Sequence, residues 1–151
     1  MKLKIRHLAP YLPYALKCRW NNSDSKELVG LQYGNESVTN ALWTWKDGNK
    51  YYTGYLYQCK PILFPLSSLT KEIAINGETF VPIYKIYEFE QWDTDELEEI
   101  INDGTIEGIY SDLDLITYSQ TERLFEWKID VFGLIEAGLA EPVTENFNPY
   151  K

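Results

Sequence analysis

Apolar and polar positions form their clearest pattern between Ser119 and Leu139, where the chain reads SQTERLFEWKIDVFGLIEAGL. Ser119 followed by Glu122 has the form of a capping box, a pair of side chains that begins a helix. Gly138 stands where the left-handed residue that follows a helix end is usually found. The pattern therefore predicts one long helix over residues 120–137.

The apolar residues of this predicted helix fall into two stripes. The first stripe, at about 100° per residue, faces the core. It consists of Leu124, Trp127, Val131, Leu134 and Ile135. The second stripe, roughly 100° around the helix, consists of Phe125, Ile129 and Phe132. We favour an arrangement in which a sheet and a second chain segment cover both stripes, because domains are built from packed layers. In the alternative, the second stripe is an exposed interaction surface for a partner protein or a second copy of the chain.

The pattern in the rest of the chain predicts strands first and short helices later. Prolines at positions 10 and 13 predict a short helical turn or an extended lead-in. Period-two alternation predicts three strands, which are Leu16–Trp20, Glu27–Tyr33 and Tyr84–Glu90. Short helices are predicted at residues 66–73 and 95–101, and strand or irregular structure at 106–117. Asn76-Gly77 either ends the first of these helices or turns a second hairpin.

Residues 41–57 have the form of a β-hairpin, because two runs rich in aromatic residues flank the polar sequence KDGN. Asp47-Gly48 suits a type I′ turn, which requires two positive φ values. In that register Trp45 lies opposite Lys50 and Trp43 opposite Tyr52. In the alternative, Asn49 shifts the turn by one residue.

The aromatic side chains of this hairpin are a candidate ligand platform. Trp43, Trp45 and Tyr52 could stack on a sugar, a base or a peptide. An aromatic ladder packed under a helix is the commoner role for such residues. Both interpretations stay open at the level of the sequence.

These elements predict an α+β fold in a single domain of 151 residues, because strands precede helices along the chain. An antiparallel sheet contains the hairpin near 41–57, and the long helix 120–137 packs on that sheet. The short helices near 66–73 and 95–101 complete the domain. The tail after about residue 142 is predicted to be loosely ordered.

The chain is acidic, with a formal net charge of −9 and a pI near 4.6. Phosphate backbones are bound by Lys and Arg, so we expect no direct nucleic-acid binding. The opening MKLKIRHLAP lacks the apolar region of a signal peptide, and no window reaches the roughly 18 apolar residues of a membrane span. Cys18 and Cys59 are expected to be reduced, buried thiols. We therefore expect a cytoplasmic protein with no membrane association.

Few residues could carry catalysis. His7 is the only histidine, and the common phosphate-binding and metalloprotease motifs are absent from the sequence. Asp112 and Asp114 would share one face of a strand and could act as an acid–base or cation-binding pair, but acidic runs are normally solvated surface. We assign no catalytic, cofactor-binding or metal-binding residue and expect no cofactor. A non-enzymatic protein is favoured, with a carboxylate-based, divalent-cation-dependent enzyme as the alternative.

Three motifs, together about a third of the chain, resemble a family of uncharacterised short proteins of Bacteroidetes genomes and their prophage-like regions. They read LAPYLPYALK, KPILFPLSSLTKEIAINGETFVPI and LFEWKIDVFGLIEAGLA. The family has no established activity, so the resemblance implies a context and no catalytic residue. Relatives often carry Gly at position 15, Arg at 64 and His at 128, where this chain has Ala15, Phe64 and Lys128. A histidine at position 128 therefore cannot be a universal catalytic base. With the acidic composition, this favours a mobile-element protein that binds another protein or itself.

Overall fold

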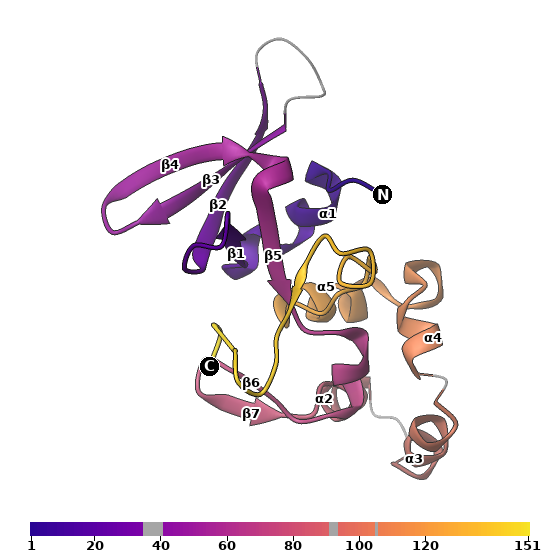
Figure 1. Ribbon diagram of the computed structural model, residues 1–151. Coiled ribbons are helices and arrows are strands. Elements are labelled where there is room, and N and C mark those ends of the chain that lie inside the picture. The colour runs from indigo at the N-terminus through magenta and orange to yellow at the C-terminus, as the bar shows by residue number, and fades with distance from the viewer. Residues whose placement is uncertain (35–40, 91–93, 105) are drawn as a thin grey trace.

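A mostly antiparallel sheet dominates one end of the molecule (Figure 1). The computed structural model describes residues 1–34, 41–90, 94–104 and 106–151. In these residues the strands of the sheet follow the order β4-β3-β2-β1-β5-β8. Their bounds are β1 Lys17–Trp20, β2 Lys26–Tyr33, β3 Ala41–Asp47, β4 Lys50–Tyr55, β5 Cys59–Leu63 and β8 Glu141–Pro142. Only the β5–β8 pair is parallel among them.

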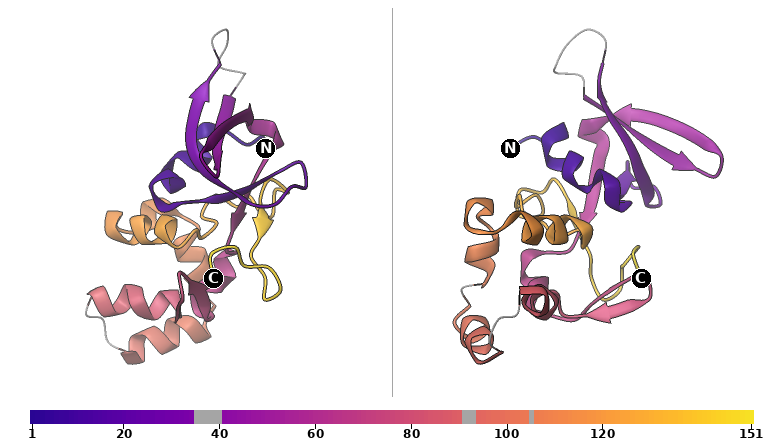
Figure 2. Two further views of the ribbon diagram at one scale, coloured as in Figure 1. Left: turned by 90° about the vertical axis from the view of Figure 1, so that its left-hand side faces the viewer. Right: turned by 180° about the vertical axis from the view of Figure 1, so that it is seen from behind.

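The helices of the N-terminal segment pack beside the sheet, and most of the later helices lie at the opposite end of the molecule (Figures 1 and 2). The α-helices are α1 Ile5–Leu8, α2 Pro82–Glu90, α3 Thr94–Asn102, α4 Ile106–Tyr110 and α5 Tyr118–Glu126. Short 3₁₀ helices are η1 Ala9–Tyr14, η2 Leu56–Gln58, η3 Leu66–Thr70 and η4 Leu113–Leu115. A small hairpin pairs β6 Ile73–Ile75 with β7 Glu78–Phe80. Helices and strands are thus mixed along the chain, and the predicted α+β class is confirmed.

Several of the local predictions are confirmed and others are wrong. The strands predicted at Leu16–Trp20 and Glu27–Tyr33 correspond to β1 and β2, and the helix predicted at 95–101 corresponds to α3. The helix predicted at 66–73 is shorter, because η3 ends at Thr70 and β6 begins at Ile73. Residues 106–117, predicted as strand or irregular structure, contain α4 and η4.

The turn at Asn76-Gly77 forms the second hairpin rather than ending a helix. Both residues have positive φ, 52° and 79°, as a type I′ turn requires. Ile75 pairs directly with Glu78 across this turn.

The strand predicted at Tyr84–Glu90 is wrong, because this segment is the helix α2. Pro82 stands in its first turn, where its fixed φ suits a helix and no backbone N–H is needed. Ile83, Ile86 and Tyr87 are buried, and their spacing of three and four residues places them on one helical face. The helical period therefore explains the apolar positions that a strand could not place on one side.

The prediction of one long helix over residues 120–137 is also wrong. The helix that forms there begins two residues earlier than predicted and is much shorter. The α5 helix spans Tyr118–Glu126. Its capping box joins Thr117 and Gln120: the Gln120 N–H donates to Thr117 Oγ1 at 3.3 Å, and the Thr117 N–H donates to Gln120 Oε1 at 3.1 Å.

The helix ends after nine residues because the chain turns into the edge of the sheet. Lys128 takes a left-handed conformation with φ of 56°. Its N–H donates to Phe125 O at 3.0 Å and the Ile129 N–H donates to Leu124 O at 2.9 Å, which is the Schellman pattern. Beyond this turn Ile129 forms a parallel bridge with Phe64, which follows β5. The bridge replaces the helical hydrogen bonds that the sequence pattern predicted.

The predicted stop at Gly138 is used, but it ends a separate turn. Gly138 has φ of 72°, and its N–H donates to Ile135 O while the Leu139 N–H donates to Leu134 O, at 3.0 and 2.8 Å. The Asp130 carboxylate begins this turn: its two oxygens accept the N–H groups of Leu134 and Ile135 at 2.9 and 2.8 Å. The carboxylate thus supplies the acceptors that a preceding helical turn would have supplied.

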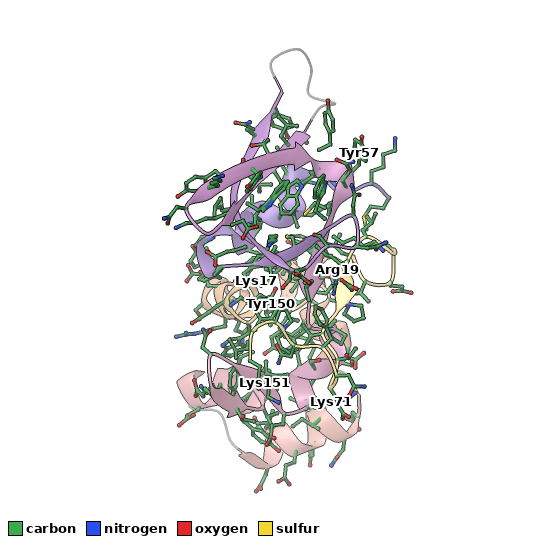
Figure 3. All side chains as sticks on the ribbon, turned by 60° about the vertical axis from the view of Figure 1, so that its left-hand side comes forward. Lys17, Arg19, Tyr57, Lys71, Tyr150 and Lys151 are labelled. Atoms are coloured by element: carbon green, nitrogen blue, oxygen red, sulfur yellow. The ribbon has the colours of Figure 1, made fainter. Side chains whose placement is uncertain are left out.

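The C-terminal tail, predicted to be loosely ordered after about residue 142, is packed into the fold. Tyr150 is buried, and its hydroxyl donates to Ile62 O at 2.6 Å and accepts from the Lys17 N–H at 3.0 Å. Asn148 donates to Ala74 O at 2.8 Å, and the Asn76 N–H donates to Tyr150 O at 2.7 Å. Figure 3 shows Tyr150 beside Lys17 in the middle of the molecule. The tail therefore joins the main sheet to the β6–β7 hairpin.

We predict that Tyr150→Phe lowers the free energy of unfolding at neutral pH by about 1–3 kcal/mol, because Ile62 O loses its buried donor. Burial raises the pKa of the Tyr150 phenol. Its contribution is fully present below the ordinary phenol pKa of about 10 and is lost as the pH rises above it, since the unfolded chain then releases a proton that the native state retains. Tyr150→Phe should therefore lose less stability than the wild type between about pH 8 and pH 11 in urea unfolding.

The control is Tyr57→Phe, because Tyr57 is 78% exposed and its phenol meets solvent in the native state. This variant should follow the wild type at every pH. Burial also raises the pKa of the Tyr11 phenol. Tyr11 therefore contributes to the decrease in the free energy of unfolding at alkaline pH in all three proteins. Equal alkaline losses in the wild type and Tyr150→Phe would contradict the prediction.

Candidate functional site

The β3–β4 hairpin confirms the predicted hairpin at 41–57, but its turn lies one residue later than Asp47-Gly48, and each cross-strand partner therefore lies two residues later than predicted. Asp47 pairs with Lys50, so Trp45 lies opposite Tyr52 and Trp43 opposite Gly54. The register predicted from a turn at Asp47-Gly48 is therefore wrong, and the alternative in which Asn49 shifts the turn by one residue is confirmed. The two turn residues are Gly48 and Asn49, and only Gly48 has positive φ, at 61°. A single positive φ at the first turn position is typical of a type II′ turn, which needs glycine there.

The tryptophans of the hairpin form a stacked cluster inside the fold. The Trp43 and Trp45 rings lie 4.5 Å apart at 28°, and the Trp20 ring lies 5.3 Å from Trp45. Trp43 is fully buried and Trp45 is 6% exposed. Of the predicted platform Trp43, Trp45 and Tyr52, only Tyr52 is open to solvent, at 43%, with its ring 5.8 Å from Trp45. The two indoles therefore lie in the core and offer no open face to a ligand.

Gly54 allows this cluster to pack against β4. A Cβ atom at position 54 would lie 3.2 Å from the Trp45 ring and 3.3 Å from Trp43 Nε1. Trp43 Nε1 is buried and has no hydrogen-bond partner among the described residues. An unmade hydrogen bond of this kind costs about 1–3 kcal/mol, so the surrounding ring packing must offset it.

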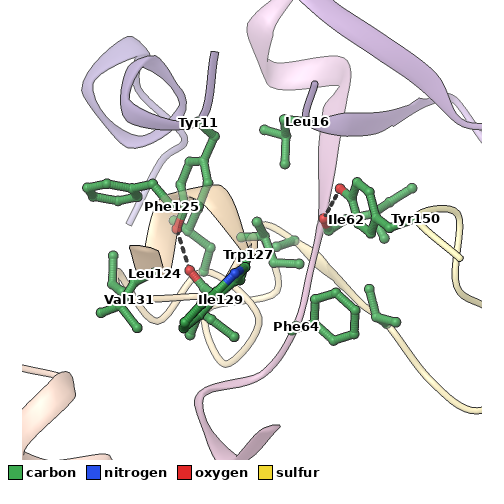
Figure 4. Packing of buried hydrophobic residues seen from close by; sticks show 14 of the residues in the cluster. Tyr11, Leu16, Ile62, Phe64, Leu124, Phe125, Trp127, Ile129, Val131 and Tyr150 are labelled. Atoms are coloured by element: carbon green, nitrogen blue, oxygen red, sulfur yellow. Dashed lines mark hydrogen bonds between the residues drawn. The ribbon is translucent and has the colours of Figure 1, made fainter. Parts of the chain in front are cut away.

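The predicted second stripe, Phe125, Ile129 and Phe132, is distributed over α5 and the segment after it. Phe125 and Ile129 are buried, at 8% and 0% exposure, and Phe132 is half-buried. The Tyr11 ring contacts Phe125 edge-on at 4.9 Å, and its hydroxyl donates to Ile129 O at 2.6 Å (Figure 4). Phe132 lies 6.0 Å from Phe125. These side chains pack η1 against α5, so they form no exposed stripe.

The exposed aromatic residues of this region are tyrosines. Tyr51 and Tyr55 point to the outer face of β4 and are 65% and 48% exposed. Tyr52 lies between them on the opposite face, at the margin of the tryptophan cluster. We call Tyr51, Tyr52 and Tyr55 the tyrosine surface. In a strand, alternate residues of YYTGY point to opposite faces of the sheet. This alternation is the sequence signal that distinguishes the outward tyrosines from the inward one.

The strand that carries the tyrosine surface is an edge of the sheet. β4 pairs with β3 on one side, and no described strand pairs with its other side. Natural edge strands are commonly protected by proline, by bulges or by charges. β4 contains no proline, and its one charged residue is Lys50 beside the turn. It therefore presents unpaired backbone groups next to exposed tyrosines.

A cavity of about 700 Å³ lies at the other end of the same strand. The N-terminal segment 1–3, the end of β4 with η2, the start of β5 and the turn at Gly138-Leu139 surround it. Its charged lining residues are Lys2 and Lys60, and no described carboxylate lines it.

The candidate carboxylates Asp112 and Asp114 are not placed for chemistry. Both are exposed, they do not lie on a strand, and the Asp112 Oδ1 atom accepts the Asp114 N–H at 3.0 Å as the cap of η4. A cavity of about 500 Å³ is lined by Glu107, Asp130 and Glu136, but both Asp130 oxygens already accept backbone N–H groups. Within the described ranges, no group of three His, Cys, Asp or Glu residues is placed to hold a metal ion.

The remaining reactive side chains are buried among structural contacts. Burial raises the pKa of the Cys59 thiol, and a hydrogen bond with Cys18 raises it further. This opposes formation of a nucleophilic thiolate. Burial lowers the pKa of His7, with the nearby charges of Arg6 and Lys4 adding to the effect. His7 Nδ1 accepts the Lys4 N–H at 3.2 Å, which fixes the imidazole at the start of α1.

Comparison of the chain with protein-family models, with curated proteins and with solved structures gives no match. In the part of the chain that the structure describes, no helix has both the length and the apolar character needed to cross a bilayer. A function must therefore be argued from the geometry of the surface.

We predict that Gly54→Ala destabilises the protein by about 1–3 kcal/mol, because the added methyl group meets rings that are stacked and buried. Gly30→Ala is the matched control on β2, which lies on the other side of β3 in the same sheet. There the nearest atom to an added Cβ is Thr44 Cβ, at an ordinary 3.4 Å. This control should be neutral or stabilised by up to about 1 kcal/mol through the unfolded chain.

Thermal or urea unfolding measures both effects, and near-ultraviolet circular dichroism of the tryptophans provides a second readout. Only Gly54→Ala should change the tryptophan spectrum. Equal stabilities of the two variants would show that the cluster does not need the glycine.

Proposed function

We propose that this chain is a non-enzymatic protein that binds another protein through β4, where an extended segment of the partner adds to the sheet edge. The observation that carries the proposal is the tyrosine surface on a strand whose second edge has no partner among the described residues. Strand addition uses main-chain hydrogen bonds for affinity and neighbouring side chains for specificity.

The composition of the surface supports a protein partner. Tyrosine is enriched in protein interfaces, because its ring gives a large contact area with few rotatable bonds and its hydroxyl can form hydrogen bonds. The tryptophan cluster packs against the inner face of β4, where the Tyr52 ring is stacked on Trp45 with ring centroids 5.8 Å apart. A strand held in this way loses little conformational freedom on binding.

The charge near the hairpin turn favours an acidic segment as the partner. Lys46 lies 5.9 Å from the Tyr51 ring, and Lys50 begins β4. Asp47 is paired with Lys26 at 3.1 Å, which neutralises the one acidic residue of the turn. A nucleic acid would also be attracted locally, but the net charge of −9 opposes a long phosphate backbone.

The resemblance to proteins of prophage-like regions gives this proposal its context. A cytoplasmic protein encoded by a mobile element and acting on a partner protein would need a binding surface and no catalytic residues. The carboxylate-enzyme alternative has no supporting geometry, because Asp112 and Asp114 are exposed and joined only through a backbone cap.

The proposal predicts site-specific crosslinking in cells that naturally encode the protein. A photoreactive phenylalanine analogue at position 51 should give a discrete adduct with one partner, because Tyr51 is 65% exposed beside the free edge. The same analogue at position 118 is the control, since Tyr118 is 77% exposed on α5 and away from the hairpin. Gel electrophoresis and mass spectrometry detect and identify the adduct.

A second pair of variants measures the contribution of the surface. Tyr51→Lys should weaken capture of the identified partner by about tenfold or more, because truncation of an interface aromatic commonly costs 1–2 kcal/mol or more. Tyr118→Lys should leave it unchanged. An adduct with a second copy of the chain, supported by sedimentation of a dimer, would assign the edge to self-association. Equal crosslinking at positions 51 and 118 would contradict the proposal.

A further inference from the structure

We propose that the cavity beside Tyr55 and Tyr57 binds a small organic anion with a flat apolar body. This site shares Tyr55 with the tyrosine surface, but the rest of its lining lies beyond the end of β4 that is far from the hairpin turn. Its volume of about 700 Å³ falls in the range of roughly 300–1,000 Å³ that is typical of sites for small molecules.

The inner wall of the cavity is apolar. Leu56 and Cys59 line it and are only 2% and 3% exposed, so they belong to the core. Leu139 lines it from the turn after Asp130. A flat apolar group placed against this wall would leave water and gain burial, at about 25 cal/mol per Å² of apolar area.

Two stacked tyrosines form the exposed part of the cavity. The Tyr55 and Tyr57 rings lie 5.4 Å apart at 13°, and they are 48% and 78% exposed. Figure 3 shows Tyr57 at the sheet end of the molecule, far from Lys71 and Lys151. Exposed, nearly parallel rings offer faces on which a flat ligand can stack.

The charge of the cavity selects an anion. Lys2 and Lys60 line it, and neither forms an ion pair with a described residue. Several other cations are paired with carboxylates, among them Lys17 with Glu27, Arg19 with Glu141, and Lys26 with Asp47. In a chain of net charge −9, a concave site with two free lysines and no described carboxylate is a local positive potential.

The probe for this site is 8-anilinonaphthalene-1-sulfonate, which carries a flat apolar body and one sulfonate. N-phenyl-1-naphthylamine is the matched uncharged probe with the same ring system. The folded protein should bind the sulfonate probe saturably at one site, with an increase in fluorescence, and should bind the uncharged probe more weakly. Competition with naphthalene-1-sulfonate, which keeps the sulfonate but lacks the anilino group, measures how much of the affinity comes from the anion and how much from the additional ring.

The variants assign the binding to the cavity. Lys60→Gln should weaken binding of the sulfonate probe by about threefold to fivefold, as expected for one partly exposed charge pair, and should leave the uncharged probe unchanged. Tyr57→Ala should weaken both probes. Lys46→Gln is the control, because Lys46 is an exposed lysine on β3 outside the cavity.

Three outcomes would overturn the proposal: no saturable binding, equal affinity for the two probes, or equal effects of Lys60→Gln and Lys46→Gln. Circular dichroism must show that each variant retains the native spectrum, since the sulfonate probe also binds partly unfolded chains. Tyr51→Lys, which tests strand addition, should not alter probe binding. Failure of one proposal is therefore distinguishable from failure of the other.

Discussion

The fold depends on the short pairing between Phe64 and the segment around Ile129. The Phe64 N–H donates to Lys128 O at 2.8 Å, and Phe64 O accepts the Asp130 N–H at 2.9 Å. The Tyr11 hydroxyl adds a bond to Ile129 O from the N-terminal helices. One extended residue of this segment thus joins the end of β5, the end of α5 and η1. These three contacts come from parts of the chain more than 60 positions apart, and together they position the buried core.

This constraint explains why local pattern predicted a longer helix than the structure contains. The capping box predicted at Ser119 and Glu122 is wrong, because the box is formed by Thr117 and Gln120. The stop predicted at Gly138 is used, but it ends a separate turn in the Schellman geometry. What interrupts the segment is Lys128, which adopts a left-handed conformation that costs a residue with a Cβ about 1–2 kcal/mol. No local signal marks it, because the compensation comes from Phe64. Burial of Lys128 over the Tyr150 ring, at 5.3 Å, adds a second distant contact.

The sequence predicted the elements whose determinants are local and missed those set by distant contacts. The hairpin of β3 and β4 was evident from its turn residues and alternating aromatics, whereas its register depended on whether the two turn residues were Asp47-Gly48 or Gly48-Asn49. The order of the tail was missed because Tyr150 finds its partners at Ile62 and Lys17. For the candidate site, the aromatic run was visible in the sequence, but the solvent exposure of each ring was not.

Strand geometry divides that aromatic run into two physical roles. In β3 the inward positions hold Trp43 and Trp45, and in β4 the outward positions hold Tyr51 and Tyr55. An indole buried without a described partner for its N–H is tolerated because it is stacked on the neighbouring indole, and Tyr52, stacked on Trp45, links β4 to this cluster. A phenol on the outer face keeps its hydroxyl in water and its ring available. The packing of the inner rings therefore determines which face of β4 is turned to solvent, and this is the face that carries Tyr51 and Tyr55.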